Sequence, residues 1–225
     1  MSKSKIDELN ILSEEEVFRQ EMQKTQGGKK SSNEFDYREF IDNYFEPMEL
    51  TEEQKEERKE AAYDLFDKFL FFFTFMALSP ESYDLALQQF EFELRTIAIQ
   101  YSRADDYIDK YVPKVAQNVA ETTRKNMGKE YYTSVERAAF DAVNETNGLL
   151  NYEELQEAIE AGYTHKTWVA EIDKKTRDSH RQIDGTTIPI DEYFQFDDCE
   201  MLMAHDEENG TAAQCVNCRC TTRFS

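Results

Sequence analysis

Hydrophobic residues recur at helical spacing along the first half of the chain. Thr51 followed by Gln54 predicts a helix start, because the two residues can form a capping box. The apolar positions behind this box recur at steps of three or four residues, with Phe72 and Phe73 adjacent, as on one helix face: Ala62, Leu65, Phe69, Phe72, Phe73 and Met76. A second stripe with this spacing follows Pro80: Tyr83, Leu87, Phe90, Leu94, Ile97 and Tyr101. We expect these stripes to face a core rather than a partner.

Three further helices are predicted before residue 162. One carries apolar residues on both sides of Pro113, which predicts a kink or a restart there. Thr133 and Glu136 can form a second capping box and predict the next helix start. Asn151 is expected to cap a last helix, which Gly162 ends in the left-handed conformation. Helices with such short connections predict a bundle.

The pattern changes after residue 162. Residues 166–172 alternate polar and apolar positions, which predicts a strand with Trp168 on its apolar side. Asp184-Gly185 is a turn dipeptide, and residues 186–190 have the composition of a second strand. Residues 166–225 therefore predict a small module that needs the bundle or a metal to hold it. The expected fold class is mainly α, an N-terminal helical bundle followed by a small α+β C-terminal module.

The first 33 residues differ from both of these parts. They end in a stretch of linker composition, Gly27-Gly28-Lys29-Lys30-Ser31-Ser32-Asn33. We interpret them as a flexible N-terminal arm, ordered only with a partner or carrying a loosely attached short helix. The predicted domains are this arm (1–33), a helical bundle (34–165) and the small module with a Cys-rich C-terminus (166–225).

Charge and composition narrow the functional classes. The 225 residues carry a net charge of −21, and −16 of it falls on residues 31–165. An aromatic content of 13% excludes a wholly disordered acidic polymer. The missing basic stripe argues against a duplex-binding surface. No signal peptide is evident, and the apolar run at residues 69–78 is half the length of a membrane span, so we expect a soluble chain made in the cytoplasm.

Four cysteines lie close to the C-terminus, at positions 199, 215, 218 and 220. The pair Cys215 and Cys218 has the C-x2-C spacing that can hold zinc. Cys220 would add a third sulfur, and His205 or Cys199 a fourth ligand. Free or buried thiols and a disulfide are the alternatives, and all three readings stay open.

A second polar cluster contains Asp173, Arg177, His180 and Asp184. It could be a catalytic group in which His180 is the base, or a metal site formed by His180 and Asp184. We favour a structural network in which Arg177 binds carboxylates while His180 and Asp173 satisfy loop backbone groups. No phosphate-binding loop, dinucleotide fingerprint or nucleophile elbow is present.

The two clusters together resemble a known family. The resemblance rests on one ordered set: Trp168, Asp173, Arg177, His180, Asp184, Gly185 and Phe194, then Asn217, Cys218, Arg219 and Cys220. This set resembles the phage Mu F-like head morphogenesis (minor capsid) proteins. The similarity covers about residues 135–225, and it departs from the family at Ala204-His205-Asp206-Glu207-Glu208, where a proline-rich stretch is usual.

The resemblance implies a virion component of a tailed phage or prophage and not an enzyme. Members of the family sit inside the procapsid in few copies, associate with the portal and act in head assembly and DNA exit. Some carry a toxin or nuclease behind this module, which we do not expect here because five residues follow Cys220. The expected location is the inside of the head, after assembly in the host cytoplasm.

The net negative charge of the chain then limits which partners we expect. An acidic chain is repelled by packaged DNA, so we expect contact mainly with the portal and other head proteins, through the helices or the arm. DNA contact would be weak and confined to Lys29-Lys30 or Lys174-Lys175, and no membrane contact is expected. Two alternatives stay open: a metal-dependent hydrolase or transferase using His180, Asp184 and the cysteines, and a zinc-stapled adaptor without a viral role.

Overall fold

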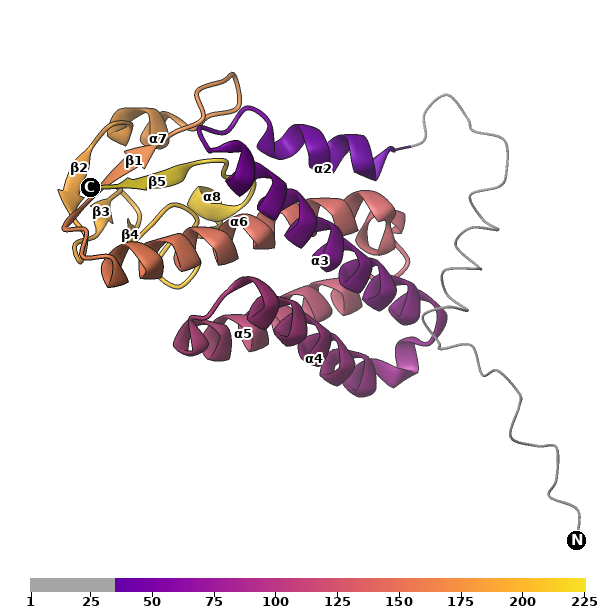
Figure 1. The fold of residues 1–225 in the computed structure, drawn as a ribbon. Coiled ribbons are helices and arrows are strands. Elements are labelled where there is room, and N and C mark those ends of the chain that lie inside the picture. The colour runs from indigo at the N-terminus through magenta and orange to yellow at the C-terminus, as the bar shows by residue number, and fades with distance from the viewer. Residues whose placement is uncertain (1–34) are drawn as a thin grey trace, which may run out of the picture. The chain divides into compact units, whose positions relative to one another are not determined.

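Helix α3 (Glu52–Leu78) forms where the capping box and the Phe-rich stripe predict it (Figure 1). In the computed structural model, which describes residues 35–225, the Gln54 main-chain N–H donates to the Thr51 hydroxyl at 3.2 Å. The expected helix face is buried, and the rings of Phe69 and Phe72 lie 5.3 and 4.4 Å from that of Phe90 on α4 (Tyr83–Tyr101). The stripes therefore form a core, as predicted. The predicted arm (residues 1–33) lies outside the described residues.

The remaining helices before α6 include one that the pattern does not predict. Helix α2 (Tyr37–Phe45) is capped by Asp36 and packs against α3 and α6, burying Ile41 and Phe45. A short 3-10 turn, η1 (Pro80–Ser82), leads into α4. Helix α5 (Asp105–Lys125) passes through Pro113 without restarting. The carbonyl that loses its donor there belongs to Asp109, an exposed residue, so solvent can satisfy it.

Helix α6 (Val135–Glu160) replaces two of the predicted helices by one. It follows the turn η2 (Glu130–Thr133) and begins at Ser134, whose hydroxyl accepts from the Arg137 N–H at 3.1 Å, rather than at Thr133. Asn151 does not cap a helix but lies inside α6 and is 1% exposed. The prediction of a cap there was wrong because a tertiary role uses the side chain. Gly162, with φ +81°, ends the helix as predicted.

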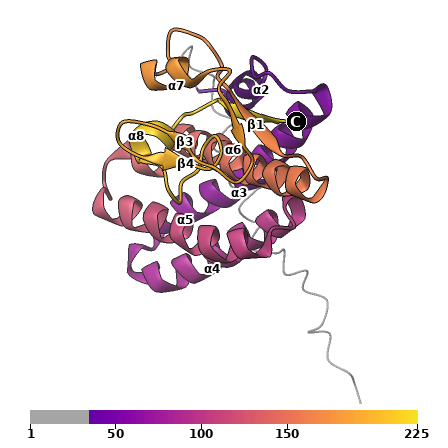
Figure 2. The ribbon, with the colours of Figure 1, turned by 90° about the vertical axis from the view of Figure 1, so that its left-hand side faces the viewer.

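The C-terminal part contains two small antiparallel sheets (Figures 1 and 2). Strand β1 (His165–Val169) lies between β2 (Thr187–Pro189) and β5 (Thr221–Phe224), and Trp168 is paired with Thr222. Strands β3 (Phe194–Gln195) and β4 (Glu200–Met201) form the second sheet. Two short helices, α7 (Asp178–Ile183) and α8 (Ala212–Cys215), lie between the strands.

These sheets enclose a core of their own and rest on α6. Buried Trp168, Phe194 and Met201 cluster with Cys215, Cys218 and Cys220. Helix α6 packs against both α3 and β5. It therefore belongs both to the helical layer (helices α2 to α6) and to the strand region (residues 165–225). The mainly α fold class with short C-terminal strands is thus confirmed. Within residues 35–225, no helix is long and apolar enough to cross a membrane.

Candidate functional site

The residues of the ordered motif converge around Trp168. Its side chain is fully buried, and its ring meets those of His180, Phe194 and Phe196 edge-on, at centroid distances of 5.3, 5.1 and 5.4 Å. Edge-to-face contacts add to the gain from burying such large rings. Trp168 on β1 therefore fixes the position of His180 on α7.

Asp173 connects the loop after β1 to the cysteine loop. Its carboxylate forms an ion pair with Arg219 and accepts the Lys175 main-chain N–H at 2.7 Å. The Arg219 guanidinium holds the pKa of Asp173 down at about 2, and the Lys175 bond adds to the effect. The expected role of Arg177 as the partner of carboxylates falls to Arg219, while Arg177 donates to the carbonyl of Val216. Both arginines therefore tie this region to the cysteine loop.

Asp184 and Gly185 hold the end of β1. The Asp184 carboxylate accepts the main-chain N–H of Ala170 at 2.9 Å, and the Gly185 N–H donates to the Trp168 carbonyl at 2.9 Å. Gly185 adopts φ +72°, a conformation that favours glycine. The Asp-Gly pair thus acts as a turn that positions Trp168, and the Asp184 side chain faces a backbone donor.

Three asparagines of α6 hold the cysteine loop from the other side. Asn147 donates to the Cys218 carbonyl at 2.8 Å, and Asn151 donates to the Ala204 and Cys220 carbonyls at 3.0 and 3.3 Å. The Asn144 side chain accepts the N–H of Asn217, which has φ +57°. No role in holding this loop was predicted for these three residues from the sequence. The available signal was polar asparagine at steps of three and four on a helix that is otherwise buried along its length.

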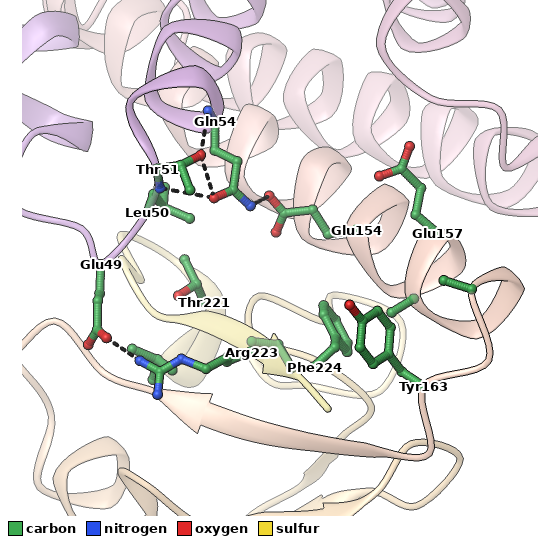
Figure 3. Close-up of a pocket in the computed structure, with 14 residues that line it drawn as sticks. Glu49, Leu50, Thr51, Gln54, Glu154, Glu157, Tyr163, Thr221, Arg223 and Phe224 are labelled. Atoms are coloured by element: carbon green, nitrogen blue, oxygen red, sulfur yellow. Dashed lines mark hydrogen bonds and ion pairs between the residues drawn. The ribbon is translucent and has the colours of Figure 1, made fainter.

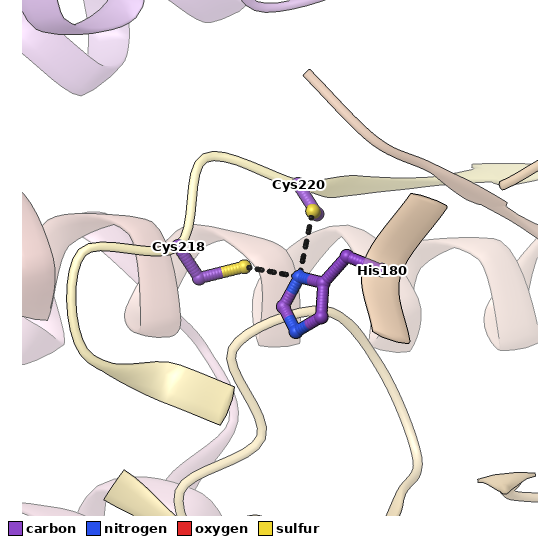
Figure 4. Close-up of side chains that lie close together, drawn as sticks. All are labelled: His180, Cys218 and Cys220. Carbon is purple, nitrogen blue, oxygen red and sulfur yellow. Dashed lines mark hydrogen bonds between the residues drawn. The ribbon is translucent and has the colours of Figure 1, made fainter. Parts of the chain in front are cut away.

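His180, Cys218 and Cys220 bring three ligand atoms together (Figure 4). The His180 Nδ1 lies 3.2 Å from the Cys220 Sγ and 3.6 Å from the Cys218 Sγ. All three residues are buried, and the three atoms lie within 4.8 Å of one another. The hydrogen bond between the two sulfurs lowers the pKa of Cys218 and raises that of Cys220, because the two thiols share a proton.

A hydrogen-bonded chain orients the His180 ring. Its Nε2 lies 3.0 Å from the Gln214 Oε1, and the Gln214 amide nitrogen donates to the Asp198 carboxylate at 2.8 Å. The Ser179 hydroxyl also donates to the Gln214 oxygen, at 3.0 Å. Because the amide nitrogen faces a carboxylate, the amide oxygen must face the ring, and Nε2 carries the proton. Nδ1 then presents its lone pair to the two sulfurs.

The structure places Cys215 and His205 away from these three residues. The Cys215 Sγ donates to the Asp206 carbonyl at 3.3 Å, and Cys199 is half-buried at the edge of the same core. The His205 Nε2 lies 3.2 Å from the Glu207 carboxylate. Of the four ligands expected from the sequence, Cys218 and Cys220 come together with His180, and the other two have separate partners. All four cysteines are free thiols.

His205 belongs to a buried acidic cluster between α5 and α6. Burial raises the pKa of Glu145 well above its usual value, and Tyr111 donates its hydroxyl to this carboxyl. Asn144 bridges Glu145 to Glu207 with amide contacts of 3.5 Å. Tyr111 and Asn144 thus hold these carboxyl groups inside the fold, while the two buried ring nitrogens of His205 have no hydrogen-bond partner among the described residues.

A large groove lies beside β5 (Figure 3). It has a volume of about 630 Å³ and is bordered by the start of α3, the end of α6 and β5. The carboxylates of Glu49, Glu154 and Glu157 line it, and Glu49 pairs with Arg223. His180 and the cysteines do not line this groove, so it has no thiol or imidazole chemistry.

Comparison with known proteins gives the protein family of the second half of the chain. Residues 113–223 match the family described as Phage Mu protein F like protein, a match that begins in the middle of α5 and ends in β5. The match covers the motif residues and extends further upstream than the predicted similarity. Residues 113–223 of this chain therefore belong to the phage Mu protein F-like family, a family of phage head-related proteins.

A curated relative adds a second comparison. The NAD(+)--arginine ADP-ribosyltransferase EFV of Enterococcus faecalis (strain ATCC 700802 / V583) is 31% identical over 134 residues. The aligned part covers 50% of this chain, and the chain spans about a quarter, 26%, of the length of that relative. No solved structure matches the chain significantly.

Proposed function

We propose that this chain is a minor head protein of a tailed phage or prophage that binds the portal and stays inside the head. The family match over residues 113–223 carries the proposal. Head proteins are its expected partners, and the virion is its expected location. Binding to the portal is the more specific claim of this proposal, and it requires a surface that can bind a partner.

The motif residues support a structural role for the Mu F-like region. Asp173 neutralises Arg219, Asp184 accepts a main-chain N–H, and Asn217 is bound by α6. Each of these three contacts holds a loop or a strand end in place, which is the use expected of a structural network. The activity in the relative's name belongs to a protein of whose length this chain spans 26%, so arginine ADP-ribosylation is not part of the proposed function.

An exposed apolar stripe on α4 offers a binding surface. Leu85, Phe92 and Ile99 recur every seven residues and are 64%, 63% and 57% exposed. Residues seven apart lie on one helix face, so the three side chains form a seam, with the polar residues Gln88, Gln89, Arg95 and Thr96 between them. Large exposed apolar patches on a helix mark interaction sites. The same helix buries Phe90, Leu94 and Ile97 against the core.

The net charge of the helical part indicates which kind of partner this seam would bind. Residues 31–165 carry −16, so a second copy of this chain would be repelled and a partner with basic flanks would be attracted. We assign the seam to the portal, which would present an apolar surface bordered by lysine or arginine. The prediction is that Phe92→Asp abolishes portal binding, because a carboxylate would have to be buried in the interface.

The test uses co-expression with the portal, scaffold and coat proteins of the same phage. The full chain should enter procapsids and cross-link to the portal, and Phe92→Asp should stay outside. Ile172→Asp is the matched control, since Ile172 is 49% exposed in the strand region. Normal packaging of Phe92→Asp would contradict the surface assignment. Absence of the unaltered chain from procapsids, or transfer of ADP-ribose to arginine by the pure chain, would contradict the function.

A further inference from the structure

We propose that His180, Cys218 and Cys220 bind one thiophilic divalent cation, zinc in the first place, and leave its fourth coordination position to solvent. The set differs from the ligands that cysteine spacing suggests, because it uses a histidine 38 residues before Cys218 and omits Cys215. The proposal is independent of the proposed function and would hold for a head protein or any other.

The distances between the ligand atoms match a tetrahedral site. Zinc binds thiolate at about 2.3 Å and imidazole nitrogen at about 2.0–2.1 Å, so a tetrahedron separates nitrogen from sulfur by roughly 3.6 Å. The His180 Nδ1 lies 3.2 Å from the Cys220 Sγ and 3.6 Å from the Cys218 Sγ. A metal could enter this set with small side-chain shifts, because the three atoms already lie around one centre (Figure 4).

The contacts of the His180 ring orient its Nδ1 atom so that it can act as a metal ligand. Metal-binding histidines donate their other ring N–H to an oxygen, which fixes the tautomer and the ring orientation. Here the Nε2–H faces the Gln214 oxygen at 3.0 Å, and Asp198 fixes the Gln214 amide from behind. Trp168 and Phe196 pack against the same ring, with centroids 5.3 and 5.5 Å away. This chain leaves Nδ1 as the ring nitrogen that faces the two sulfurs.

The backbone around the sulfurs is held just as firmly. Asn147 and Asn151 bind the carbonyls of Cys218 and Cys220, and Arg219 between them pairs with Asp173. A small cavity of about 20 Å³ adjoins the three ligands and is lined also by Glu171 and Arg177. That volume has room for about one water molecule, which would supply the fourth ligand.

The charges balance when the metal enters. Each of the two thiols loses its proton, so zinc(II) and two thiolates with a neutral imidazole form a group of net charge zero: Zn²⁺ + 2 Cys-SH gives the site and 2 H⁺. A neutral group suits a place where all three residues are buried, because an uncompensated charge there would be costly. The metal would join α7 to the start of β5 across the strand region.

Metal content tests the assignment directly. The full chain is expressed in zinc-supplemented medium, purified under reducing conditions and measured by mass spectrometry of the metal, and about one zinc ion per chain is expected. Cys218→Ser and Cys220→Ser should each lose the metal. Cys215→Ser, a buried cysteine outside the set, is the matched control and should keep it.

A second measurement covers the case in which the serine variants fail to fold. Cobalt(II) added to the metal-free, unaltered chain should give thiolate-to-cobalt charge-transfer absorption, and Gln214→Ala should weaken its affinity by about 10-fold to 100-fold. A chain that contains no zinc and gives no such absorption would overturn the proposal. Equal loss of metal in Cys215→Ser would overturn this ligand set.

Discussion

At the residue scale, the Asp173–Arg219 pair sets a pH dependence. A carboxyl whose pKa is lowered from about 3.9 in the unfolded chain to about 2 stabilises the fold above pH 4 and loses that effect as the pH falls towards 2. The Asp173 side chain is 36% exposed, so solvent screens the pair and its contribution should be about 1 kcal/mol or less. Asp173→Asn should lower the free energy of unfolding by that amount at pH 7.

The measurement is urea unfolding at pH 7 and at steps between pH 4 and pH 2. The difference between Asp173→Asn and the unaltered chain should shrink over the acidic steps, since both then carry an uncharged side chain. Asp197→Asn is the control, because Asp197 is also an exposed aspartate of the strand region. A difference that does not change with pH would show that the ion pair is not its cause.

Gly148 is a second residue whose identity has a local cause. It lies inside α6, where glycine costs about 1 kcal/mol relative to alanine. A Cβ atom there would lie 2.9 Å from the Cδ2 of buried His205, which cannot withdraw. Gly148→Ala should therefore destabilise the fold by about 1–3 kcal/mol despite the better helix propensity. A double-mutant cycle with His205→Ala checks the cause, and additive effects of the two changes would contradict it.

At the element scale, α6 and its asparagines hold the cysteine loop in place. Asn147→Ala would remove the 2.8 Å donor of the buried Cys218 carbonyl and leave it only the Tyr44 hydroxyl at 3.4 Å. Such a loss costs about 1–3 kcal/mol, and the loop and β5 should exchange their amide hydrogens faster. Asn118→Ala on α5 is the control, because that side chain is exposed. Equal stability of the two variants in urea would contradict this role of α6.

The same element shows what sequence patterns could and could not predict. Periodicity and the capping box predicted α3 and α4 and their buried stripes, because both signals depend on neighbours along the chain. The break at Asn151 was wrong because the asparagine binds Ala204 and Cys220 across the fold. The grouping of His180 with Cys218 and Cys220 depends on the packing of Trp168, which spacing along the chain does not encode.

At the scale of the whole molecule, the helical layer and the strand region share α6, and residues 36–225 form one unit by their contacts. The predicted boundary between residues 165 and 166 would allow two separate unfolding events. We propose instead that both parts unfold together, because the asparagines and buried Arg58, bound to Asn151 and Glu154, join the layers through α6.

The chain carries its own probe for this prediction. Trp168 is its single tryptophan and reports on the strand region by fluorescence, while circular dichroism reports mainly on the helices. If unfolding is cooperative, the two signals should give the same midpoint and the same steepness in urea. Asn147→Ala should shift both curves by the same amount, since it weakens a contact between the parts. A tryptophan transition at lower urea, with helicity intact, would instead establish residues 166–225 as an independently unfolding module.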